Sequence, residues 1–535
     1  MKRGNLLVLL GSICCVPVMV AQEKTGDAEK LGNVHFAVSC LPATQPQFDR
    51  AVAMLHSFWY PQGLNAFADI TKSDPDCAMA YWGMAISRRA NPMVGAPGAG
   101  PDALKDGLEA VGKASLAGAK TQRERDYIAA IETYYKDWEK RDYRTRVLAY
   151  EKAMEDVYLR YPDDPEAAVF YALAIDEAVN VLPADPNFTR QLKAGSILEK
   201  VLAANPEHPG ALHYLIHSYD FPALADRGLA AARKYGDVAP AAPHALHMPS
   251  HVYCMLGMWQ DSIKANQAAL SVANGYVHAL DFMVYAYLQM AQDIEAKRGV
   301  DRNMELLKSQ GASGDANPTG AVLVGDTALA AIPARYAIER GAWTEAAALQ
   351  PQVGTLVADS ITYFARAMGA VRSGDLEAAL KNIRQLNQIE ERLLQSKDDY
   401  WAQQVEIGRN AATAWVAYVE GRKDAAMKLM RTAADLEDGS EKHVAMENRL
   451  WPMRELLGDL LLEVAEPGPA LKEYEISLQS ARNRYRGLYG AARAAQRTGD
   501  SEKARSYYAR LLTLCSHADT ERPELAEAKK YLASK

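Results

Sequence analysis

Apolar and small residues follow one repeated pattern along most of this chain. In five segments a glycine closes one apolar stretch and a small residue follows five positions later; these small residues are Ser262, Ala346, Ala379, Ala426 and Ala504. A small side chain at such a point lets two helices pack closely. The pattern therefore predicts successive pairs of helices, with the small residue where the next helix crosses the one before it.

Proline marks further turns of the same kind. The segments "SDPDCAMAYWGMAI" at 73–86, "DDPEAAVFYALAI" at 163–175 and "NPEHPGALHYLIH" at 205–217 each place proline where a helix begins. This arrangement resembles the tetratricopeptide repeat, a helix pair of about 34 residues. The resemblance implies an all-α, right-handed superhelical solenoid of antiparallel helix pairs, in which each pair buries its apolar face only against its neighbours.

Three phrases are also shared with a group of exported bacterial tetratricopeptide proteins, which this chain resembles. They are "HPGALHYLIHSYD", "HALHMPSHVY" and "DPDCAMAYWGMA". This second resemblance implies the same fold, and it brings no established activity with it.

Two Gly/Pro-rich interruptions divide the pattern. Residues 91–101 and 309–326 lack helical periodicity and are predicted to be loops. We expect an N-terminal solenoid over 22–308, an interrupting loop over 309–326 and a continuing C-terminal solenoid over 327–535.

Histidines are concentrated in one part of the N-terminal solenoid. Seven of the eleven lie between positions 208 and 278, and taking Pro206 and Pro240 as equivalent turn residues aligns them with a period of 34. The aligned columns are Gly210, His244 and His278; His213, His247 and Asp281; His217, His251 and Tyr285; Asp220, Cys254 and Leu288. Column offsets of zero, three, seven and ten correspond to one face of a helix, so these side chains are predicted to share a face of three successive helices. In tetratricopeptide proteins the equivalent face lines the concave groove. The resemblance therefore implies that these side chains lie in such a groove.

The spacing of these histidines allows metal binding. In each of the two His-x-x-x-His pairs the Cβ atoms lie about 5–6 Å apart on one helix, and packed helices lie about 8–10 Å apart. The predicted ligands are His213, His217, His244, His247, His251, His278 and Asp281. Imidazole with carboxylate suits Zn, Cu, Fe or Ni, and the sequence does not choose among them.

Three functions remain open for this face. The first is an exported binding protein with a metal site of histidine and aspartate in its groove, which holds a peptide, a protein, a small molecule or a metal ion without turnover. The second is a metalloenzyme, in which Asp220, Asp281 and Tyr285 are the candidate acid, base or hydrogen-bonding groups. The third is a metal-free peptide- or protein-binding scaffold. The glutamate of the zinc-peptidase motif His-Glu-x-x-His is absent, because Tyr214 and Met248 follow the first histidines of the pairs.

Proline also affects how the second histidine pair is presented. Pro249 favours a regular helix that starts near Met248, which would leave His244 and His247 on its entry loop. The segment at 330–343 repeats this arrangement, with Pro333 in place of Pro249 and Arg335 in place of His251. The proline-containing segment therefore recurs, but the imidazole of His251 is not repeated in it.

Composition narrows the choice of partner. The chain has 535 residues, 49% hydrophobic and 24% charged, as expected of a folded protein. Its formal net charge is −7 with no basic tract, which argues against nucleic acid as a partner. No apolar run beyond the first residues is long enough for a transmembrane segment.

The first residues predict export. Lys2 and Arg3 precede an apolar stretch that ends at a small-residue cleavage site, so residues 1–21 are predicted to be a signal peptide, and the mature protein to be periplasmic or secreted. An exported protein can keep disulfides, and Cys40 with Cys77 is the plausible pair. Cys254 is expected to be a buried thiol.

Overall fold

The computed structural model describes Met1 and residues 30–534, apart from residues 90, 96–97, 311–320, 441–443 and 447. The predicted signal peptide at 1–21, beyond Met1, and the middle of the predicted loop at 309–326 lie outside the described residues. Among the residues described, no helix combines the length and the apolar character needed to cross a membrane.

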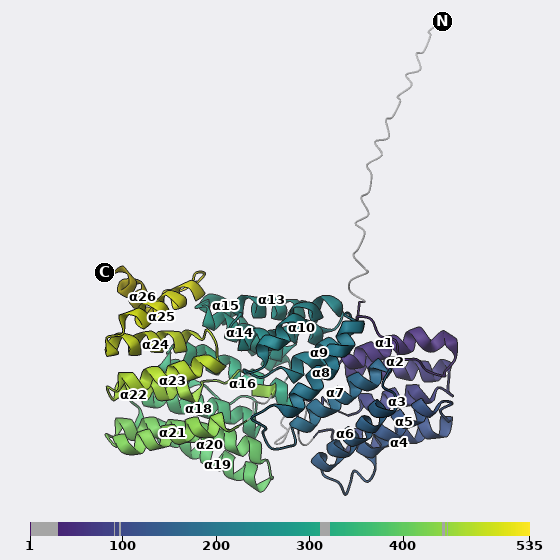
Figure 1. The fold of residues 1–535 in the computed structure, drawn as a ribbon. Coiled ribbons are helices and arrows are strands. Elements are labelled where there is room, and N and C mark those ends of the chain that lie inside the picture. The colour runs from purple at the N-terminus through teal and green to yellow at the C-terminus, as the bar shows by residue number, and fades with distance from the viewer. Residues whose placement is uncertain are drawn as a thin grey trace.

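The described residues form helices and no strand (Figure 1). In chain order these are η1 (Pro42–Thr44), α1 (Gln45–His56), α2 (Tyr60–Ser73), α3 (Ala78–Ser87), α4 (Pro101–Ala117), α5 (Gln122–Tyr135), α6 (Tyr143–Arg160), α7 (Pro165–Val179), α8 (Thr189–Ala204), α9 (Pro209–Ser218), α10 (Ala225–Val238), α11 (Pro243–His247), α12 (Pro249–Met255), α13 (Trp259–Val272), α14 (Val277–Gln289), α15 (Asp293–Gln310), α16 (Ala321–Glu339), α17 (Trp343–Ala348), α18 (Leu356–Arg372), α19 (Leu376–Gln395), α20 (Asp399–Val419), α21 (Lys423–Asp438), η2 (Val444–Met446), α22 (Met453–Glu463), α23 (Pro467–Ser480), α24 (Tyr485–Thr498), α25 (Ser501–Leu514) and α26 (Pro523–Ala533).

Successive helices pack in pairs, and the pairs stack. Each helix contacts the next along the chain, while α7 contacts α9, α12 contacts α14, and α14, α16, α18 and α20 contact one another in sequence. Two large apolar clusters follow this stack from one pair to the next. The predicted all-α solenoid is therefore confirmed.

The small residues of the repeat lie where the sequence places them. Ser262, Ala346, Ala379, Ala426 and Ala504 are all fully buried. The same close approach occurs at Gly490 of α24, where an added Cβ would lie 2.2 Å from the ring of Tyr474. Helix crossings in this chain thus depend on the absence of side-chain bulk.

The loop predicted at 309–326 is shorter than expected. Helix α15 continues to Gln310 and α16 already starts at Ala321, so residues 309–310 and 321–326 are helical. Leu323 is buried in the apolar core, and a glycine such as Gly325 inside a helix costs only about 1 kcal/mol relative to alanine. Burial of the apolar segment therefore outweighs its glycine. At 91–101 the described residues before Pro101 are non-helical, in agreement with the prediction.

The C-terminal repeats fold back onto the middle of the chain. Helices α24–α26 lie beside α13–α15 in Figure 1. The Trp259 indole donates to the carbonyl of Asn483 at 2.9 Å, and the carboxylate of Asp519 accepts the backbone N–H of Ile294 at 3.1 Å. The solenoid therefore closes a turn on itself, so that the face inside the turn is enclosed by both halves of the chain.

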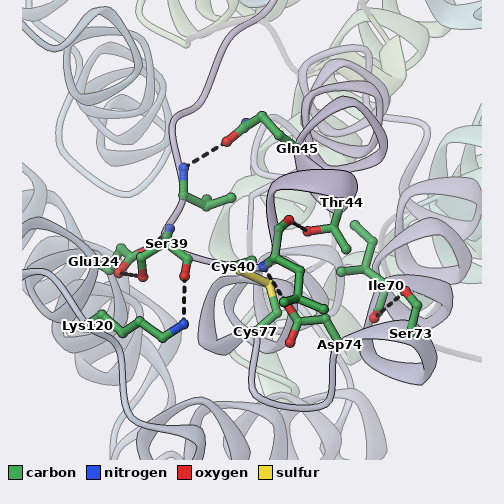
Figure 2. The surroundings of a disulfide bond; sticks show 12 residues. Ser39, Cys40, Thr44, Gln45, Ile70, Ser73, Asp74, Cys77, Lys120 and Glu124 are labelled. Atoms are coloured by element: carbon green, nitrogen blue, oxygen red, sulfur yellow. Dashed lines mark hydrogen bonds between the residues drawn. A yellow bond between two sulfur atoms is a disulfide. The ribbon is translucent and has the colours of Figure 1, made fainter.

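A non-helical segment at residues 30–41 leads into the first helix. Its backbone is fixed by a hydrogen bond from Asn33 N–H to the carbonyl of Glu207, 2.9 Å long, and by one from Leu41 N–H to Asp74, 2.6 Å long. At its end Cys40 is joined to Cys77 by the predicted disulfide (Figure 2). The bond links this segment to the turn that precedes α3.

We predict that replacing Ala504 by leucine destabilises the protein by about 1–3 kcal/mol, because the added side chain overfills a closed helix crossing. Urea unfolding followed by circular dichroism measures the difference. The matched control is Ala509→Leu on the exposed side of the same helix, for which we expect a change within about 0.5 kcal/mol. Equal effects of the two substitutions would contradict this account of the repeat.

Candidate metal centre

Four helices supply the clustered histidines. Helix α9 begins at Pro209 and is capped by His208, whose Nδ1 accepts the N–H of Ala211 at 3.2 Å. It carries His213 and His217 one turn apart. The segment predicted as an entry loop is instead a short helix, α11, which carries His244 and His247; Pro249 then starts α12 with His251, and α14 carries His278. Proline at the first position fits both α11 and α12, so the chain bends at Met248 without losing helical conformation.

Three imidazoles form a first trio, made of His213, His217 and His244. Nε2 of His213 lies 3.1 Å from Nε2 of His217 and 3.0 Å from Nε2 of His244. Their possible ligand atoms all lie within 4.8 Å of one another. The three side chains thus point one ring nitrogen each toward a common centre.

A second trio, made of His247, His251 and His278, repeats this arrangement one unit further along. Nε2 of His247 lies 3.0 Å from Nε2 of His251, and the ligand atoms of the trio again lie within 4.8 Å of one another. His278 is 5% exposed, yet neither of its ring nitrogens has a hydrogen-bond partner among the described residues. The trios are neighbours, since the rings of His217 and His251 are 6.3 Å apart between centroids.

In three of these histidines the opposite ring nitrogen faces a partner outside the centre. Nδ1 of His213 donates to the carbonyl of His56 at 2.6 Å, and Nδ1 of His251 donates to Asp220 at 3.0 Å. Nδ1 of His247 lies 2.7 Å from Oδ1 of Asn266.

The orientation of the Asn266 amide decides which atom donates in that contact. Its Nδ2 donates to the carbonyl of Ser262, which leaves Oδ1 to accept the Nδ1 proton of His247. His247 and His251 therefore both carry their proton on Nδ1, and their Nε2 lone pairs face each other.

One phenylalanine ring covers each trio. The Phe58 centroid lies 4.4 Å from that of His213 and 5.4 Å from that of His244, and Phe58 has the left-handed φ of 51°. Phe282 lies 4.9 Å from His247 and 4.8 Å from His251 between centroids. Each phenylalanine ring thus packs against two imidazoles of its trio.

Burial favours the neutral form of four of these imidazoles by lowering their pKa. It lowers the pKa of His247 to about 3, with repulsion from His251 adding to the effect. Burial likewise lowers the pKa of His213, His244 and His278 well below the usual range. Neutral imidazole is the form that binds a metal ion.

The carboxylates and the tyrosine predicted near the histidines have other partners. Asp220 accepts from His251 at its outer nitrogen, so it orients a histidine and does not join the converging ring nitrogens. Both oxygens of Asp281 accept from Arg335, at 2.8 and 3.3 Å. Burial raises the pKa of Asp281, and Arg335 opposes that shift. Cys254 is buried as predicted, 3.3 Å from the hydroxyl of Ser262.

Tyr285 belongs to an ion network that the closing turn creates. Arg484, which precedes α24, donates to the Tyr285 hydroxyl at 2.7 Å and to both oxygens of Glu455 at 2.9 Å. It also pairs with Glu339 at 2.8 Å, and Arg484, Glu339 and Glu455 are all nearly inaccessible to solvent. The candidate acid of the sequence prediction is thus a member of a structural charge network.

A third histidine cluster has a different chemistry. Glu166 accepts from Nε2 of His56 at 2.8 Å and from Nε2 of His208 at 3.1 Å. Burial acts to raise the pKa of Glu166, but the two imidazoles hold it below the usual range. His56 is fully buried and reaches the first trio through its backbone carbonyl.

Two cavities are lined by Phe221, and the smaller one is also lined by His217 of the first trio. A small one of about 50 Å³ is lined by Met93, Asp176, Val179, Asn180, Gln191, His217, Asp220 and Phe221. A cleft of about 450 Å³ lies on the other side of Phe221, between α12 and the C-terminal helices α22 and α23. In the small cavity Asp176 has a pKa that burial raises well above its usual value.

Several residues around the trios were not identified from the sequence. Asn266 follows the buried Ser262 by four positions on α13, so a polar residue on a buried face could have signalled it. Phe282 follows His278 by the same spacing. Phe58 could not have been found, since its position depends on an unusual backbone conformation far from the histidines in sequence.

No protein-family model matches this chain, and no curated protein matches it. Among solved structures the chain is similar to human IFIT1 in a dimer with m7Gppp-AAAA, at 11% identity and a TM-score of 0.39, covering 78% of this chain and 87% of that one. It is also similar to a tetratricopeptide repeat protein from Parabacteroides merdae ATCC 43184, at 11% identity and a TM-score of 0.26, covering 65% and 98%. A third is the Cut9–Hcn1 hetero-tetramer of APC/C, at 11% identity and a TM-score of 0.34, covering 91% and 83%. Likenesses of this degree transfer no ligand, partner or activity.

We predict that Arg335→Met destabilises the protein by about 3–5 kcal/mol, because it leaves the buried carboxylate of Asp281 without its cation. Chemical denaturation measures the change. Arg340→Met, which removes a partly exposed pair with Glu345, serves as the control and should cost less than about 1 kcal/mol. A similar small effect at both positions would show that Asp281 does not depend on Arg335.

Proposed function

We propose that this protein is an exported helical-repeat protein that binds transition-metal ions through six histidines, three to each of two ions. The first ion would be held by His213, His217 and His244, and the second by His247, His251 and His278. The observation that carries the proposal is the convergence of ring nitrogens inside each trio, with the outer nitrogens of His213, His247 and His251 hydrogen-bonded elsewhere.

The distances inside the trios fit a shared ion. Two nitrogens bound to one Zn-sized ion at about 2.0–2.1 Å, in neighbouring coordination positions, lie roughly 2.9–3.4 Å apart. The Nε2 atoms of His247 and His251 are 3.0 Å apart, and those in the first trio are 3.0 and 3.1 Å apart. Metal-ligating histidines commonly donate their other N–H to a carbonyl or a carboxylate, as His213 and His251 do.

A shared proton is the alternative to a metal, and it fits the second trio less well. With both Nδ1 atoms donating outward, a proton between His247 and His251 would make one ring an imidazolium. Burial opposes that charge, since it lowers the pKa of His247 to about 3. A metal ion removes the lone-pair repulsion without protonating either ring.

The donor set indicates the class of metal. All six proposed ligands are neutral imidazoles, which suit Cu, Zn, Ni and Fe and disfavour Mg or Ca. Without Asp281 no carboxylate is in the ligand set, which places Cu and Zn first in our proposal.

Export is supported by two features of the chain. The first residues have the pattern of a signal peptide, and the Cys40–Cys77 disulfide belongs to an oxidising compartment. We therefore place the metal-bound protein in the periplasm or outside the cell.

Binding of a peptide or small molecule is a second candidate function. The cleft of about 450 Å³ combines apolar side chains such as Met255 and Trp259 with charged ones such as Glu437 and Arg454. Such a mixture of apolar walls and a few polar groups is usual for ligand sites.

We predict that the full-length protein binds about two ions per chain after reconstitution with Cu or Zn, since each trio supplies three ligands. His217→Ala and His251→Ala should each lose about one equivalent, because each removes one ligand from one trio. Elemental analysis of the desalted protein measures the content.

His35→Ala provides the control for these variants. His35 is an exposed histidine paired with Asp49, so its removal should leave the metal content unchanged. If the wild-type protein holds no stoichiometric metal after reconstitution with Zn, Cu, Fe and Ni, the proposal is wrong.

Asp220→Asn should weaken metal binding about 10–100-fold, because loss of the carboxylate charge lowers the basicity of His251. Competition with a chromophoric chelator measures the affinity. Asp237→Asn, an exposed carboxylate on α10, is the matched control. An unchanged affinity in Asp220→Asn would remove Asp220 from the second trio's support.

A further inference from the structure

We infer that the ion on the first trio keeps an open position, and that this position takes a small ligand carrying N–H or O–H hydrogens in the cavity lined by Asp176 and Gln191. The ligand class is water, a small alcohol or a small amine. The inference rests on the proposed metal at His213, His217 and His244.

The cavity adjoins the trio through His217. It measures about 50 Å³ and has four polar residues besides that histidine, contributed by α7, α8 and the segments that follow α7 and α9. Three protein ligands leave a tetrahedral ion one position short, which is the arrangement of sites that bind water or substrate. The only trio residue that lines this cavity, among the described residues, is His217.

Two buried oxygens in the cavity require a hydrogen-bond donor. Asp176 is 5% exposed and Gln191 is 2% exposed. Within the described part of the chain neither Oδ1 of Asp176 nor Oε1 of Gln191 has a hydrogen-bond partner, although Oδ2 of Asp176 accepts from Ser218 at 2.8 Å. Leaving such groups unsatisfied is unfavourable, so the pair points to a ligand with hydrogens to donate.

The volume limits the size of that ligand. A cavity of about 50 Å³ has room for roughly three or four water-sized probes, which excludes a sugar or a peptide side chain of ordinary length. Phe221 lines both this cavity and the cleft of about 450 Å³, and its ring packs against Phe188 at 5.4 Å between centroids. Because Phe221 lines both spaces, our inference takes the cleft as the route by which a small molecule reaches the ion.

The test uses the full chain loaded with Co(II), whose visible spectrum responds to a new ligand. Three probes separate the requirements: methylamine has a lone pair and N–H donors, azide has lone pairs and no hydrogens, and tert-butylamine has donors but exceeds the cavity. We expect methylamine to change the spectrum saturably, and azide and tert-butylamine to bind at least about tenfold more weakly.

Two variants test whether methylamine binds in this cavity. Val179→Phe fills the cavity, and Gln191→Leu removes one acceptor at similar volume. Each should weaken methylamine binding at least about tenfold at unchanged cobalt content. Gln404→Leu is the matched control, since Gln404 also lines a cavity and has an unpartnered amide nitrogen among the described residues, but on α20.

The outcomes separate this inference from the metal proposal. If the wild-type protein holds cobalt and methylamine leaves its spectrum unchanged, the open position is refuted while the metal site stands. Binding that persists in both Val179→Phe and Gln191→Leu would place the ligand elsewhere and refute the cavity. A wild-type protein that takes up no metal refutes the proposed function itself. Should Val179→Phe fail to fold, Gln191→Leu still decides the question.

Discussion

A helix pair in this chain has no core of its own, so it buries its apolar face only against the pairs before and after it. The two large apolar clusters run from pair to pair for this reason. Stacking of this kind brings equivalent positions of successive pairs side by side. The contact between His213 of α9 and His244 of α11, 3.0 Å between Nε2 atoms, is therefore a direct consequence of the packing. The site depends on the same constraint as the fold.

The 34-residue register predicted much of this centre. It grouped the two His-x-x-x-His pairs with the histidines at offset zero, and each trio consists of one pair plus the offset-zero histidine of the next unit. The sequence comparison also placed Arg335 where His251 stands two units earlier but could not show its effect. In the structure Arg335 neutralises Asp281, which occupies the column of His247 in the third unit. The series of aligned histidines thus ends before the unit in which arginine replaces imidazole.

The C-terminal repeats fold back onto the middle of the chain, and the contacts that they make there could not be predicted from the sequence. Tyr285 and Arg484 are 199 residues apart, and no periodicity relates them. The length of the loop at 309–326 was overestimated for a related reason. Burial of Leu323 in an apolar cluster shared with distant segments decides the conformation of residues 321–326. Local patterns determine the helix pairs and the spacing of side chains on them. Closure of the turn is determined by long-range packing.

Closure of the turn also pairs the buried charged side chains with one another. Arg484 sits between Glu339 and Glu455, and Arg335 sits against Asp281, all within the enclosed turn. Buried pairs of this kind add little net stability, but an unpaired member is strongly unfavourable, so they favour one closed arrangement over others. These acids are committed to arginines and do not join the histidine trios.

The third histidine cluster shows why residue type alone does not identify a metal centre. His56, Glu166 and His208 bring their polar atoms as close together as either trio does. There both imidazoles direct a nitrogen at a carboxylate, so donors meet an acceptor and the cluster is complete by itself. In the second trio the outer nitrogens of His247 and His251 already have acceptors, and their inner nitrogens bring lone pair against lone pair. What distinguishes the two arrangements is the direction of the hydrogen bonds around them, and only the second creates a demand for a cation.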